Sequence, residues 1–448
     1  MSRLKGMLPP SWESVKLGQF VENEKGKKPK KQTVEKTAEC NLPYVDIEAF
    51  EEGNIKSWTN GEGCRVCYES DFLMVWDGSR SGLVGKGMHG ALGSTLVRIN
   101  FPGMNNQYAY YFLLSKYQEI NTRAKGSGTP HVDPDLLWNY EFLVAPISEQ
   151  ERIVAKIEEL FSELDNGITA LKTAREQLEV YRQAVLIYAF EGKLTKKWRE
   201  HNNVAKSSWL DTTVQKLALS GPSNGRSVKD RAGGFPVLRL TALKNGKIDL
   251  NEFKEGAWDK DDAHNYIVSE GDFLFSRGNG SKHLVGRGGL VTKPLFDVAF
   301  PDTIMRISLD KTKVSPSFFS YLWESRLIRS QIEMSARTTA GIYKINQQHV
   351  KGFRLMLPSL TEQKVITEII EEKLSVVDAQ LDELEQQIAK AEILRQSILK
   401  KAFSGQLVPQ DPNDEPASEL LARIQAEKKA VNTQKTKKTR KIHSTPRH

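Results

Sequence analysis

The stretch SEQERIVAKIEELF, residues 148–161, decides the fold because it returns as TEQKVITEIIEEKL at residues 361–374. The two copies align without a gap over residues 148–194 and 361–407, at an offset of 213, and 17 of the 47 positions are identical. Both copies also end alike, in AFEGKL and AFSGQL. The chain is therefore a tandem repeat.

Three short motifs and one tryptophan occur in the same order upstream of each copy. They are ESDFL at 69–73 and EGDFL at 270–274, LVGKG at 83–87 and LVGRG at 284–288, TLVRI at 95–99 and TIMRI at 303–307, and Trp12 and Trp209. The ESDFL and LVGKG pairs share an offset of 201. Each repeat unit is therefore predicted to contain a globular part followed by a helical part. Away from these motifs the globular parts diverge while the helical parts stay alike. The two helices are therefore expected to contact the same partner, and the two globular parts different partners.

Each copy of the opening stretch predicts one long helix. Apolar residues recur at alternating spacings of three and four, a coiled-coil period that is sustained over about six heptads in each copy. Arg175 and Arg182 lie within the first seam, no proline interrupts either copy, and Ser148 and Thr361 are suitable N-cap residues. At 1.5 Å per residue, each helix would be about 65 Å long. The predicted seam residues are Ile157, Phe161, Leu164, Ile168, Leu171, Leu178 and Val185 in the first copy and Ile370, Leu374, Val377, Leu381, Leu384, Ile388 and Ile398 in the second.

The globular parts have the pattern of mixed α/β modules. Short apolar runs such as LPYVDI at 42–47 and FPVLRL at 235–240 are separated by Gly-rich turns, and a helical pattern follows in each part. We therefore predict an α+β fold with two mixed α/β modules, each followed by a long helix. The predicted boundaries are 1–146 for the first module, 147–208 for the first long helix and a linker, 209–358 for the second module, 359–407 for the second long helix, and 408–448 for a helical segment and a basic disordered tail.

The positive charge of the chain is concentrated at one end. The formal net charge is +8, and residues 423–448 carry nine Lys and Arg against one Glu, which accounts for all of it. Bulk charge therefore says little about the folded part, and only local clusters of cations can indicate a nucleic-acid surface. The tail is predicted to be a disordered basic arm, either a merely solvated one or a weak phosphate-binding segment.

Composition also limits the class of protein. The longest apolar run, AVLIYAF at 184–190, is too short to span a bilayer, and the first residues lack the apolar run of an export signal. We therefore expect a cytoplasmic protein with no membrane contact. Three cysteines cannot form a disulfide framework. CRVC at 64–67 lacks a second pair of zinc ligands and is better explained as a half-buried strand.

Motifs of catalysis are incomplete in the sequence. GKGMHG at 85–90 matches GxGxxG, but the second half has Val291 in place of the last glycine, and no acidic residue follows at a spacing suited to a dinucleotide. GLVGK at 82–86 lacks the first glycine and the Ser or Thr of an ATP-binding loop. The sequence contains no HExxH, and its histidines are scattered. We therefore predict no catalytic residue, no bound metal and no enzyme activity.

Two differing modules that alternate with two matched long helices resemble the specificity subunit of type I restriction-modification enzymes. Each helix is opened by a Glu-Gln pair and closed by AF(E/S)G(K/Q)L, and the resemblance covers residues 8–430. AFEGKLTKKWRE at 189–200 and LLARIQAEKKA at 420–430 are also similar to members of that family. The modules differ from each other, with WDGSRSG at 76–82 against SRGNGSKH at 276–283, as different DNA targets would require.

The resemblance implies that each module is a target recognition domain and that the two long helices pack antiparallel, with pseudo-two-fold symmetry, and hold the domains apart. The target would be double-stranded DNA with two unequal half-sites and an untouched spacer. The implied partners are two methyltransferase subunits, for which the repeated helices offer equivalent docking surfaces, and through them two restriction subunits. The chain itself would bind no cofactor, because S-adenosylmethionine belongs to the methyltransferase and ATP and Mg²⁺ belong to the restriction subunit. The resemblance also implies a bacterial protein.

Candidate DNA contacts are cations and polar side chains on predicted loops, since such groups suit phosphate oxygens and base edges. GSGTPH at 126–131 and TTAGIYK at 338–344 occupy equivalent places before the helices and are predicted to face a ligand. The candidates are Lys25, Lys27, Lys28, Lys30, Lys31, Arg80, Lys86, Arg123 and Lys125 in the first module and Arg226, Lys229, Arg231, Arg277, Asn279, Lys282, Arg287, Arg337, Tyr343 and Lys344 in the second. The seam residues are the candidates for the helix pair and the partner interface.

Two other classes of protein are compatible with this sequence. A non-catalytic scaffold, in which coiled-coil helices join two protein- or carbohydrate-binding modules, would have the same helices and the same neutral core. A nuclease of unfamiliar type would need a cluster of acidic metal ligands, and the sequence offers no convincing one.

Overall fold

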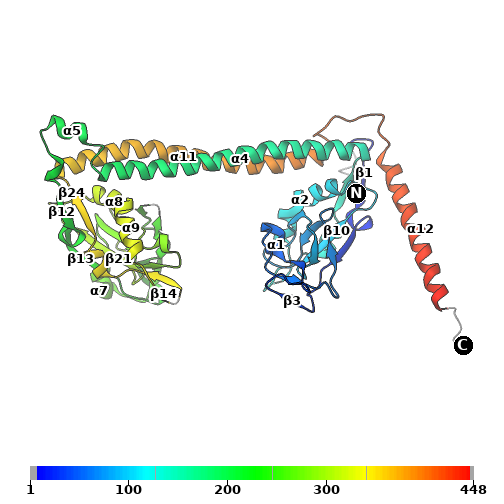
Figure 1. Ribbon diagram of the computed structural model, residues 1–448, viewed down its shortest axis with the longest axis horizontal. Helices are drawn as coiled ribbons and strands as arrows, with labels where there is room; N and C mark the ends of the chain where they lie inside the picture. The colour runs from blue at the N-terminus through cyan, green and yellow to red at the C-terminus, as the bar shows by residue number, and fades with distance from the viewer. Residues whose placement is uncertain (1–7, 127, 245, 340, 444–448) are drawn as a thin grey trace. The chain divides into compact units, whose positions relative to one another are not determined.

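The computed structural model describes residues 8–443 apart from residues 127, 245 and 340, and it describes residue 339 and residues 431–443 by their backbone alone. The start of the first predicted module, 1–7, and the end of the predicted tail, 444–448, lie outside the described residues. The chain forms two compact units (Figure 1). Unit 1 comprises Met1–Ala170 and Gln387–His448, and unit 2 comprises Leu171–Gln386. The division falls inside the long helices, whereas the boundaries predicted from the sequence lie at their ends.

The globular part of unit 1 contains two sheets, with strand orders β2-β10-β7-β8 and β3-β5-β4-β9-β6, and an antiparallel pair of β1 with β11. Phe72 of β7 and Phe112 of α2 belong to a core that also includes apolar residues of the long helices. The strands are β1 (Glu13–Lys16), β2 (Glu22–Lys25), β3 (Gln32–Thr33), β4 (Leu42–Val45), β5 (Trp58–Thr59), β6 (Val66–Cys67), β7 (Phe72–Val75), β8 (Val84–Lys86), β9 (Gly90–Leu92), β10 (Leu96–Asn100) and β11 (Glu141–Val144), and the helices are α1 (Ile47–Glu52), α2 (Asn106–Thr122) and α3 (Pro134–Trp138).

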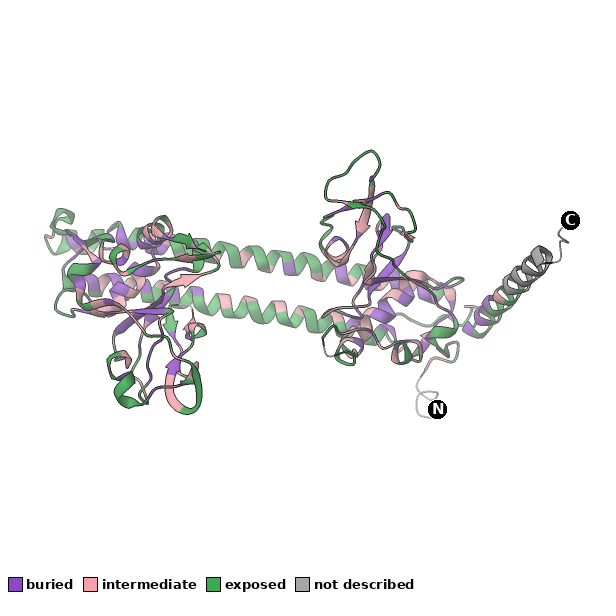
Figure 2. Ribbon diagram, turned by 90° about the horizontal axis from the view of Figure 1, so that it is seen from below, coloured by how far each residue is buried: buried purple, intermediate pink, exposed green. Residues whose placement is uncertain are grey.

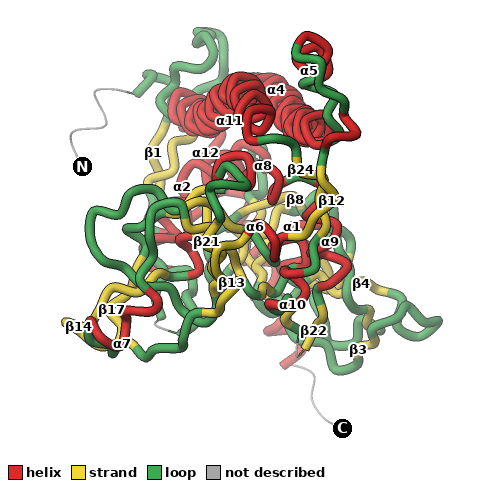
Figure 3. Tube along the Cα trace, turned by 90° about the vertical axis from the view of Figure 1, so that its left-hand side faces the viewer, coloured by secondary structure: helices red, strands yellow, loops and turns green. Residues whose placement is uncertain are grey.

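The globular part of unit 2 repeats this plan with a six-stranded sheet of order β13-β21-β18-β20-β16-β15 and an antiparallel pair of β12 with β24. Helix α8 lies between the long helices and the sheet (Figures 1 and 3), where Phe319 and Trp323 pack against Phe273 of β18. The strands are β12 (Leu210–Thr213), β13 (Ala218–Asn224), β14 (Asp230–Leu238), β15 (Leu243–Lys244), β16 (Lys247–Ile248), β17 (Phe253–Gly256), β18 (Asp272–Ser276), β19 (Gly278–Asn279), β20 (Gly288–Leu290), β21 (Ile304–Leu309), β22 (Arg337–Thr339), β23 (Ile342–Lys344) and β24 (Arg354–Leu357), and the helices are α5 (Lys196–His201), α6 (Val214–Leu217), α7 (Lys260–Ala263), α8 (Pro316–Glu324), α9 (Arg326–Ser335) and α10 (Gln347–Lys351).

The long helices α4 (Ile147–Phe190) and α11 (Leu360–Ala402) each contribute to both units. Arg182 forms an ion pair with Asp378 in unit 2, and Arg395 forms one with Asp165 in unit 1. Both pairs are related by the offset of 213. Since the later α4 residue meets the earlier α11 residue, the helices are antiparallel, which confirms the fold implied by the resemblance.

Burial along the two long helices follows the predicted coiled-coil period. All fourteen predicted seam residues are buried or half-buried. Many other positions between the ends of both helices are exposed (Figure 2). The seam therefore forms the contact between the helices, as the alternating spacing of three and four requires.

The starts of the two long helices differ from the prediction. The carbonyl oxygens of Pro146 and Ser359 already accept hydrogen bonds from the backbone N–H groups of Gln150 and Gln363, both at 2.8 Å. Ser148 and Thr361 therefore lie inside the first turn and are not N-caps. In α11 the cap is Ser359, whose Oγ accepts a hydrogen bond from the Glu362 N–H at 3.3 Å.

One predicted repeat match is displaced by three residues in the structure. Gly82 donates its N–H to the carbonyl oxygen of Val75 at 2.7 Å, and Gly286 donates its N–H to that of Ser276 at 3.0 Å. Val75 and Ser276 are 201 positions apart, but the two glycines are 204 apart. The match of LVGKG with LVGRG is therefore wrong as a structural equivalence, because the loop after β18 is three residues longer than the loop after β7.

The C-terminal segment also differs from the prediction. Helix α12 runs from Ala417 to His443, so most of the expected disordered arm is helical. No glycine or proline occurs between these residues, and Ala, Gln, Lys and Arg all favour a helix. The beginning of α12 packs into the core of unit 1 through Leu420, Leu421 and Ile424.

Candidate nucleic-acid interface

In unit 2 the fold brings together candidate residues that lie more than fifty positions apart in sequence. The sheet β19-β23-β22 pairs Gly278 with Lys344, Asn279 with Tyr343, and Arg337 with Lys344. Arg277 directly precedes β19, and its carbonyl oxygen accepts the N–H of Ile345 at 3.0 Å. The predicted loop 338–344 is therefore a hairpin that lies beside the loop after β18.

The charged side chains of this small sheet are free to meet a ligand. Arg337 and Lys344 are exposed, and Arg277, Asn279 and Tyr343 are half-buried. Within the described part of unit 2, no carboxylate forms an ion pair with Arg277, Arg337 or Lys344. Because successive residues of a strand point to opposite faces, the pairing places Arg337 and Lys344 on one face of this sheet and Asn279 and Tyr343 on the other. Such cationic, amide and phenol groups suit both phosphate oxygens and base edges.

The other candidates of unit 2 divide into two groups. Lys282 and Arg287 are exposed on the loop that joins β18 to β20, close in sequence to the small sheet. Arg226 and Arg231 instead lie beside Trp258: the Arg226 guanidinium is 5.5 Å from the ring centre, and Arg231 Nη2 donates to the Trp258 carbonyl oxygen at 3.1 Å. Lys229 is exposed in the same segment.

Unit 1 has the same arrangement around its own loop. Gly78 donates its N–H to the carbonyl oxygen of Pro130 at 2.7 Å, and His131 forms bridges with Asp77 and Lys125. The predicted loop 126–131 is thus the counterpart of the hairpin in unit 2, and it lies beside the loop after β7. The prediction that the two loops occupy equivalent places is confirmed by these backbone contacts.

The cations of unit 1 differ from those of unit 2 because most of them have acidic partners. Arg80 is paired with Glu51, and the remaining pairs are Lys25 with Asp77 at 2.7 Å, Lys30 with Glu62 at 3.0 Å, Lys31 with Glu39 at 2.5 Å, Arg123 with Glu119 at 3.5 Å, and Lys125 with Asp133 at 2.9 Å. The hydrogen bond from Lys125 lowers the pKa of Asp133, and the same contact raises the pKa of Lys125. Lys27, Lys28 and Lys86 are exposed, and no carboxylate among the described residues is paired with them.

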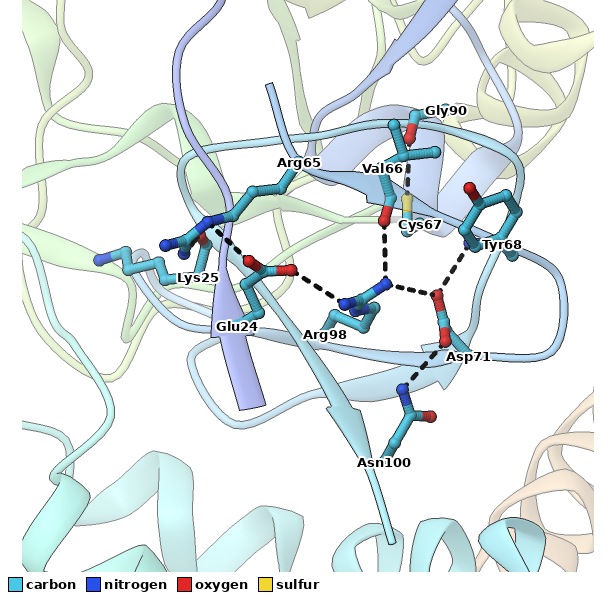
Figure 4. A network of polar contacts seen from close by, with 10 residues as sticks. All are labelled: Glu24, Lys25, Arg65, Val66, Cys67, Tyr68, Asp71, Gly90, Arg98 and Asn100. Carbon is cyan, nitrogen blue, oxygen red and sulfur yellow. Dashed lines mark hydrogen bonds and ion pairs between the residues drawn. The ribbon is translucent and has the colours of Figure 1, made fainter. Parts of the chain in front are cut away.

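Sequence reasoning missed an ion pair that joins a half-buried arginine to a buried aspartate in each module. Arg98 Nη2 donates to Glu24 Oε2 at 2.9 Å and its Nη1 lies 3.7 Å from Asp71 Oδ2 (Figure 4). Arg306 Nη1 lies 3.6 Å from Asp272 Oδ2 in the equivalent place of unit 2. The arginine shared by TLVRI and TIMRI is the sequence signal for this pair, which joins β10 to the start of β7 and β21 to the start of β18.

The described residues also bear on metal binding and on thiol reactivity. Within the described ranges, no group of three or more His, Cys, Asp and Glu side chains is placed to hold a metal ion. Cys67 is buried in β6, where its Sγ donates to the Gly90 carbonyl oxygen at 3.4 Å, and burial raises the pKa of the thiol to about 11. The half-buried strand predicted for CRVC is confirmed. None of the helices in the described chain has the length and apolar character needed to cross a bilayer.

A matched contact joins each module to its long helix and explains part of the repeated opening stretch. Trp12 Nε1 donates to Glu149 Oε2 in unit 1, and Trp209 Nε1 donates to Glu362 Oε2 in unit 2, both at 2.9 Å. The tryptophan precedes the first strand of its module, and the glutamate is in the first turn of the long helix. The glutamate of each Glu-Gln pair therefore has an internal role that needs no partner protein.

The neighbouring glutamine makes the same two hydrogen bonds in each unit. Gln150 Oε1 accepts from the Asn105 N–H at 3.0 Å, and its Nε2 donates to the Ala145 carbonyl oxygen at 2.8 Å. Gln363 binds the Ser315 N–H and the Pro358 carbonyl oxygen in the same way, at 2.8 and 2.9 Å. Each glutamine thus fixes the entrance to its long helix against the helical part of its module.

Exposed apolar residues recur on the long helices at the repeat offset. Val180 and Tyr181 of α4 correspond to Ile393 and Leu394 of α11, and the four side chains are 47 to 70% exposed. In unit 2, Tyr181 also lines a mainly apolar groove of 860 Å³ between the helices. Large apolar side chains that recur in an exposed position on both repeats indicate a surface for protein contact.

Known proteins with similar sequences share the whole repeat. A family model described as "Type I restriction modification DNA specificity domain" matches residues 9–177 and 220–393. The EcoKI specificity subunit of Escherichia coli strain K12 is 27% identical over 400 residues, which cover 84% of each chain. The StySPI specificity subunit of Salmonella potsdam is 26% identical over 463 residues, covering 96% of this chain and 98% of that one.

A solved structure supports the fold. A chain from work on complex assembly and conformational transition of the type I restriction-modification system matches with a TM-score of 0.65 at 17% identity. The match covers 89% of this chain and 99% of that chain. The modules and the helix pair thus recur together in another protein.

Proposed function

Because the chain belongs to the family of type I restriction modification DNA specificity domains, we propose that it reads a two-part DNA sequence, one part with each module. It is a specificity subunit, a recognition component and not a catalyst. The observation that carries the two-part reading is the pair of equivalent loops. Their backbone is held alike in both units, but their side chains differ, with Asp77 and Arg80 in one and Arg277, Asn279 and Lys282 in the other.

The long helices would set the distance between the two half-sites. A palindrome is read by a symmetric dimer, whereas one chain with two unlike modules has only pseudo-symmetry and should read unlike half-sites. Inserting seven residues into both α4 and α11 would move the modules apart by about 10 Å, since each residue adds about 1.5 Å. The preferred gap should then lengthen while both half-sites stay the same, and an unchanged gap would contradict this role.

We also propose that two methyltransferase subunits dock on the long helices, and that restriction subunits join through them. Support comes from the exposed pairs Val180 and Tyr181, and Ile393 and Leu394, which recur at the repeat offset. The partners would bring the cofactors, S-adenosylmethionine to the methyltransferase and ATP with Mg²⁺ to the restriction subunit. Because the substrate is intracellular DNA, we infer a cytoplasmic location.

The test of this proposal is a map of methylated adenines in cells that express the chain with a type I methyltransferase subunit. A methyltransferase must take the adenine out of the stack, so its sites report where the complex is held. We expect one motif with two parts and a fixed gap, which disappears when this chain is deleted. The absence of such a motif would favour the scaffold class instead.

A further inference from the structure

Behind the loop of unit 1, the end of helix α2 holds the loop by its carbonyl oxygens. The amide Nδ2 of Asn121 donates to the carbonyl oxygens of Ser79 and Ser81, each at 3.0 Å. These two residues flank Arg80, whose side chain is exposed. One side chain therefore fixes the backbone on both sides of the loop's cation.

In unit 2 the equivalent loop is held from the same side by α8 and α9. Arg329 Nη2 donates to the His283 carbonyl oxygen at 2.9 Å, and Trp323 Nε1 donates to that of Gly286 at 2.7 Å. Burial and the nearby Arg287 guanidinium lower the pKa of Arg329 to about 10, so it stays charged at neutral pH. A charged donor makes a stronger hydrogen bond to a carbonyl than a neutral amide does.

The close approach of helix and loop is built into both units. Gly82 and Gly286 have φ of +91° and +70°, a region that favours glycine. A Cβ at Gly82 would lie 2.4 Å from Ile120 Cγ2, and a Cβ at Gly286 would lie 3.0 Å from Ile332 Cδ1. The same contact of a left-handed glycine with a helical isoleucine thus occurs twice, although the loops differ in length.

We propose that Asn121 and Arg329 are positioning residues for DNA specificity, each fixing the loop that presents the base-reading side chains of its module. The inference rests on the proposed function. Base readout requires side chains held to within about 0.5 Å, which exposed loops achieve only when their backbone is supported from behind. Asn121 would act on the half-site of unit 1 and Arg329 on that of unit 2, through backbone carbonyls and without touching DNA.

The variants are chosen so that each has a matched control on the same helix. Arg329→Met keeps the apolar stem and removes the donors, and its control is Arg326→Met, because Arg326 is exposed one turn earlier. Asn121→Asp keeps the size and replaces the donor by an acceptor that repels the carbonyls. Its control is Gln118→Glu, which adds the same charge at an exposed position of α2. Arg329→Lys restores one charged donor and serves as the rescue.

Each variant is expressed with the methyltransferase subunit, and methylated adenines are mapped as for the unmodified chain. We expect Arg329→Met to lose about tenfold of its preference at one or more bases of one half-site, with the gap and the other half-site unchanged. Asn121→Asp should relax the opposite half-site. Both controls should give the original motif, and Arg329→Lys should recover part of the preference.

The outcomes separate this inference from the proposed function. Failure of the unmodified chain to give a two-part motif would overturn the proposed function and the inference with it. If the unmodified chain gives the motif but both variants keep it intact, or weaken both half-sites equally, the positioning role is wrong and the proposed function stands. Should Arg329→Met fail to fold, Asn121→Asp and Arg329→Lys decide the question.

Discussion

The two repeats fasten their modules to the long helices in the same way but differ in one partner of the central glutamate. In unit 2, Glu362 Oε1 accepts from Arg199 Nη1 and from the Thr195 hydroxyl, both at 2.7 Å. In unit 1, Glu149 Oε1 accepts instead from the neutral Gln410 Nε2 at 2.6 Å. Both carboxylates are buried, but only Glu362 accepts a hydrogen bond from a cation, whereas Glu149 accepts from one amide and one indole.

This difference teaches that a repeated motif can conserve geometry while its electrostatics diverge. Arg199 and Glu362 have side-chain exposures of 8% and 0%, so neither charge is solvated. A buried ion pair adds little over an apolar contact, but removing one partner leaves a buried charge, which is costly. The stability of unit 1 does not depend on such a pair, because the hydrogen-bond donors to Glu149 are neutral.

The largest expected effect is therefore Glu362→Gln. The glutamine can still accept from Trp209, but the Arg199 guanidinium is left buried without a counter-charge, so unit 2 should lose about 3–5 kcal/mol of its unfolding free energy. Urea unfolding followed by tryptophan fluorescence would measure it. A loss no larger than that of Glu149→Gln would remove the distinction between the two junctions.

The glutamines should behave alike, and at an intermediate level. Gln150→Leu and Gln363→Leu each leave a buried carbonyl oxygen without its donor, at a cost of about 1–3 kcal/mol, while the part-buried backbone N–H can turn to water. The second should cost slightly more, because Gln363 Nε2 also donates to the Lys313 carbonyl oxygen at 3.0 Å. The same unfolding experiment checks both, and effects that differ by several kcal/mol would show that these contacts are not equivalent.

The loops extend the comparison to DNA. Lys344 has no acidic partner among the described side chains, whereas Lys125 is paired with Asp133 at 2.9 Å. Lys344→Gln should therefore lower the slope of log affinity against log salt by about 1, as expected when one phosphate contact is lost. Lys125→Gln should change the slope less. Binding of target DNA by the assembled complex at several salt concentrations measures this, and equal slopes for both variants would contradict it.

The smallest effect should come from Glu149→Gln, and it should depend on pH. Burial raises the pKa of the Glu149 carboxyl, against the opposing hydrogen bonds from Trp12 and Gln410. A carboxyl whose pKa is higher in the folded state contributes stability below its unfolded value, about 4.5, and loses that contribution as pH rises through the folded value. The unfolding free energy of the variant should thus lie within about 1 kcal/mol of that of the unmodified chain at neutral pH, and should fall further below it in acid. Unfolding midpoints of both proteins at neutral and at acid pH test this. A difference that does not change with pH would show that Glu149 does not titrate as stated.

The helix pair was predictable because its signal is periodic and internal. The spacing of seam residues such as Ile157 and Val377 determines which face is buried, and the offset of 213 shows that both helices share it. The boundaries were less accurate: a hydrogen bond from Gln150 to Pro146 starts α4 before the residue that looked like its cap. The fate of the tail also escaped prediction, because charge composition alone does not distinguish a solvated helix from a disordered arm.

The candidate site was predictable only as a set of residue types. Arg277 and Lys344 were both selected, but their meeting on one small sheet depends on strand pairing between distant segments. The sequence also does not show which cations are already paired with a carboxylate, because partners such as Lys25 and Asp77 lie 52 positions apart. The supporting residues Asn121 and Arg329 carried no sequence signal, since they act on backbone carbonyls and not through a motif.

The division of the chain has a consequence for synthesis on the ribosome. Unit 2 is continuous, Leu171–Gln386, whereas unit 1 needs both the first residues and those after Gln387. Phe403, Leu420 and Ile424 complete the core around Trp12 and Tyr108, so that apolar surface stays open until these residues have been synthesised. The order of folding should therefore run against the order of translation, with the second module complete first and the first module dependent on chaperones while it waits.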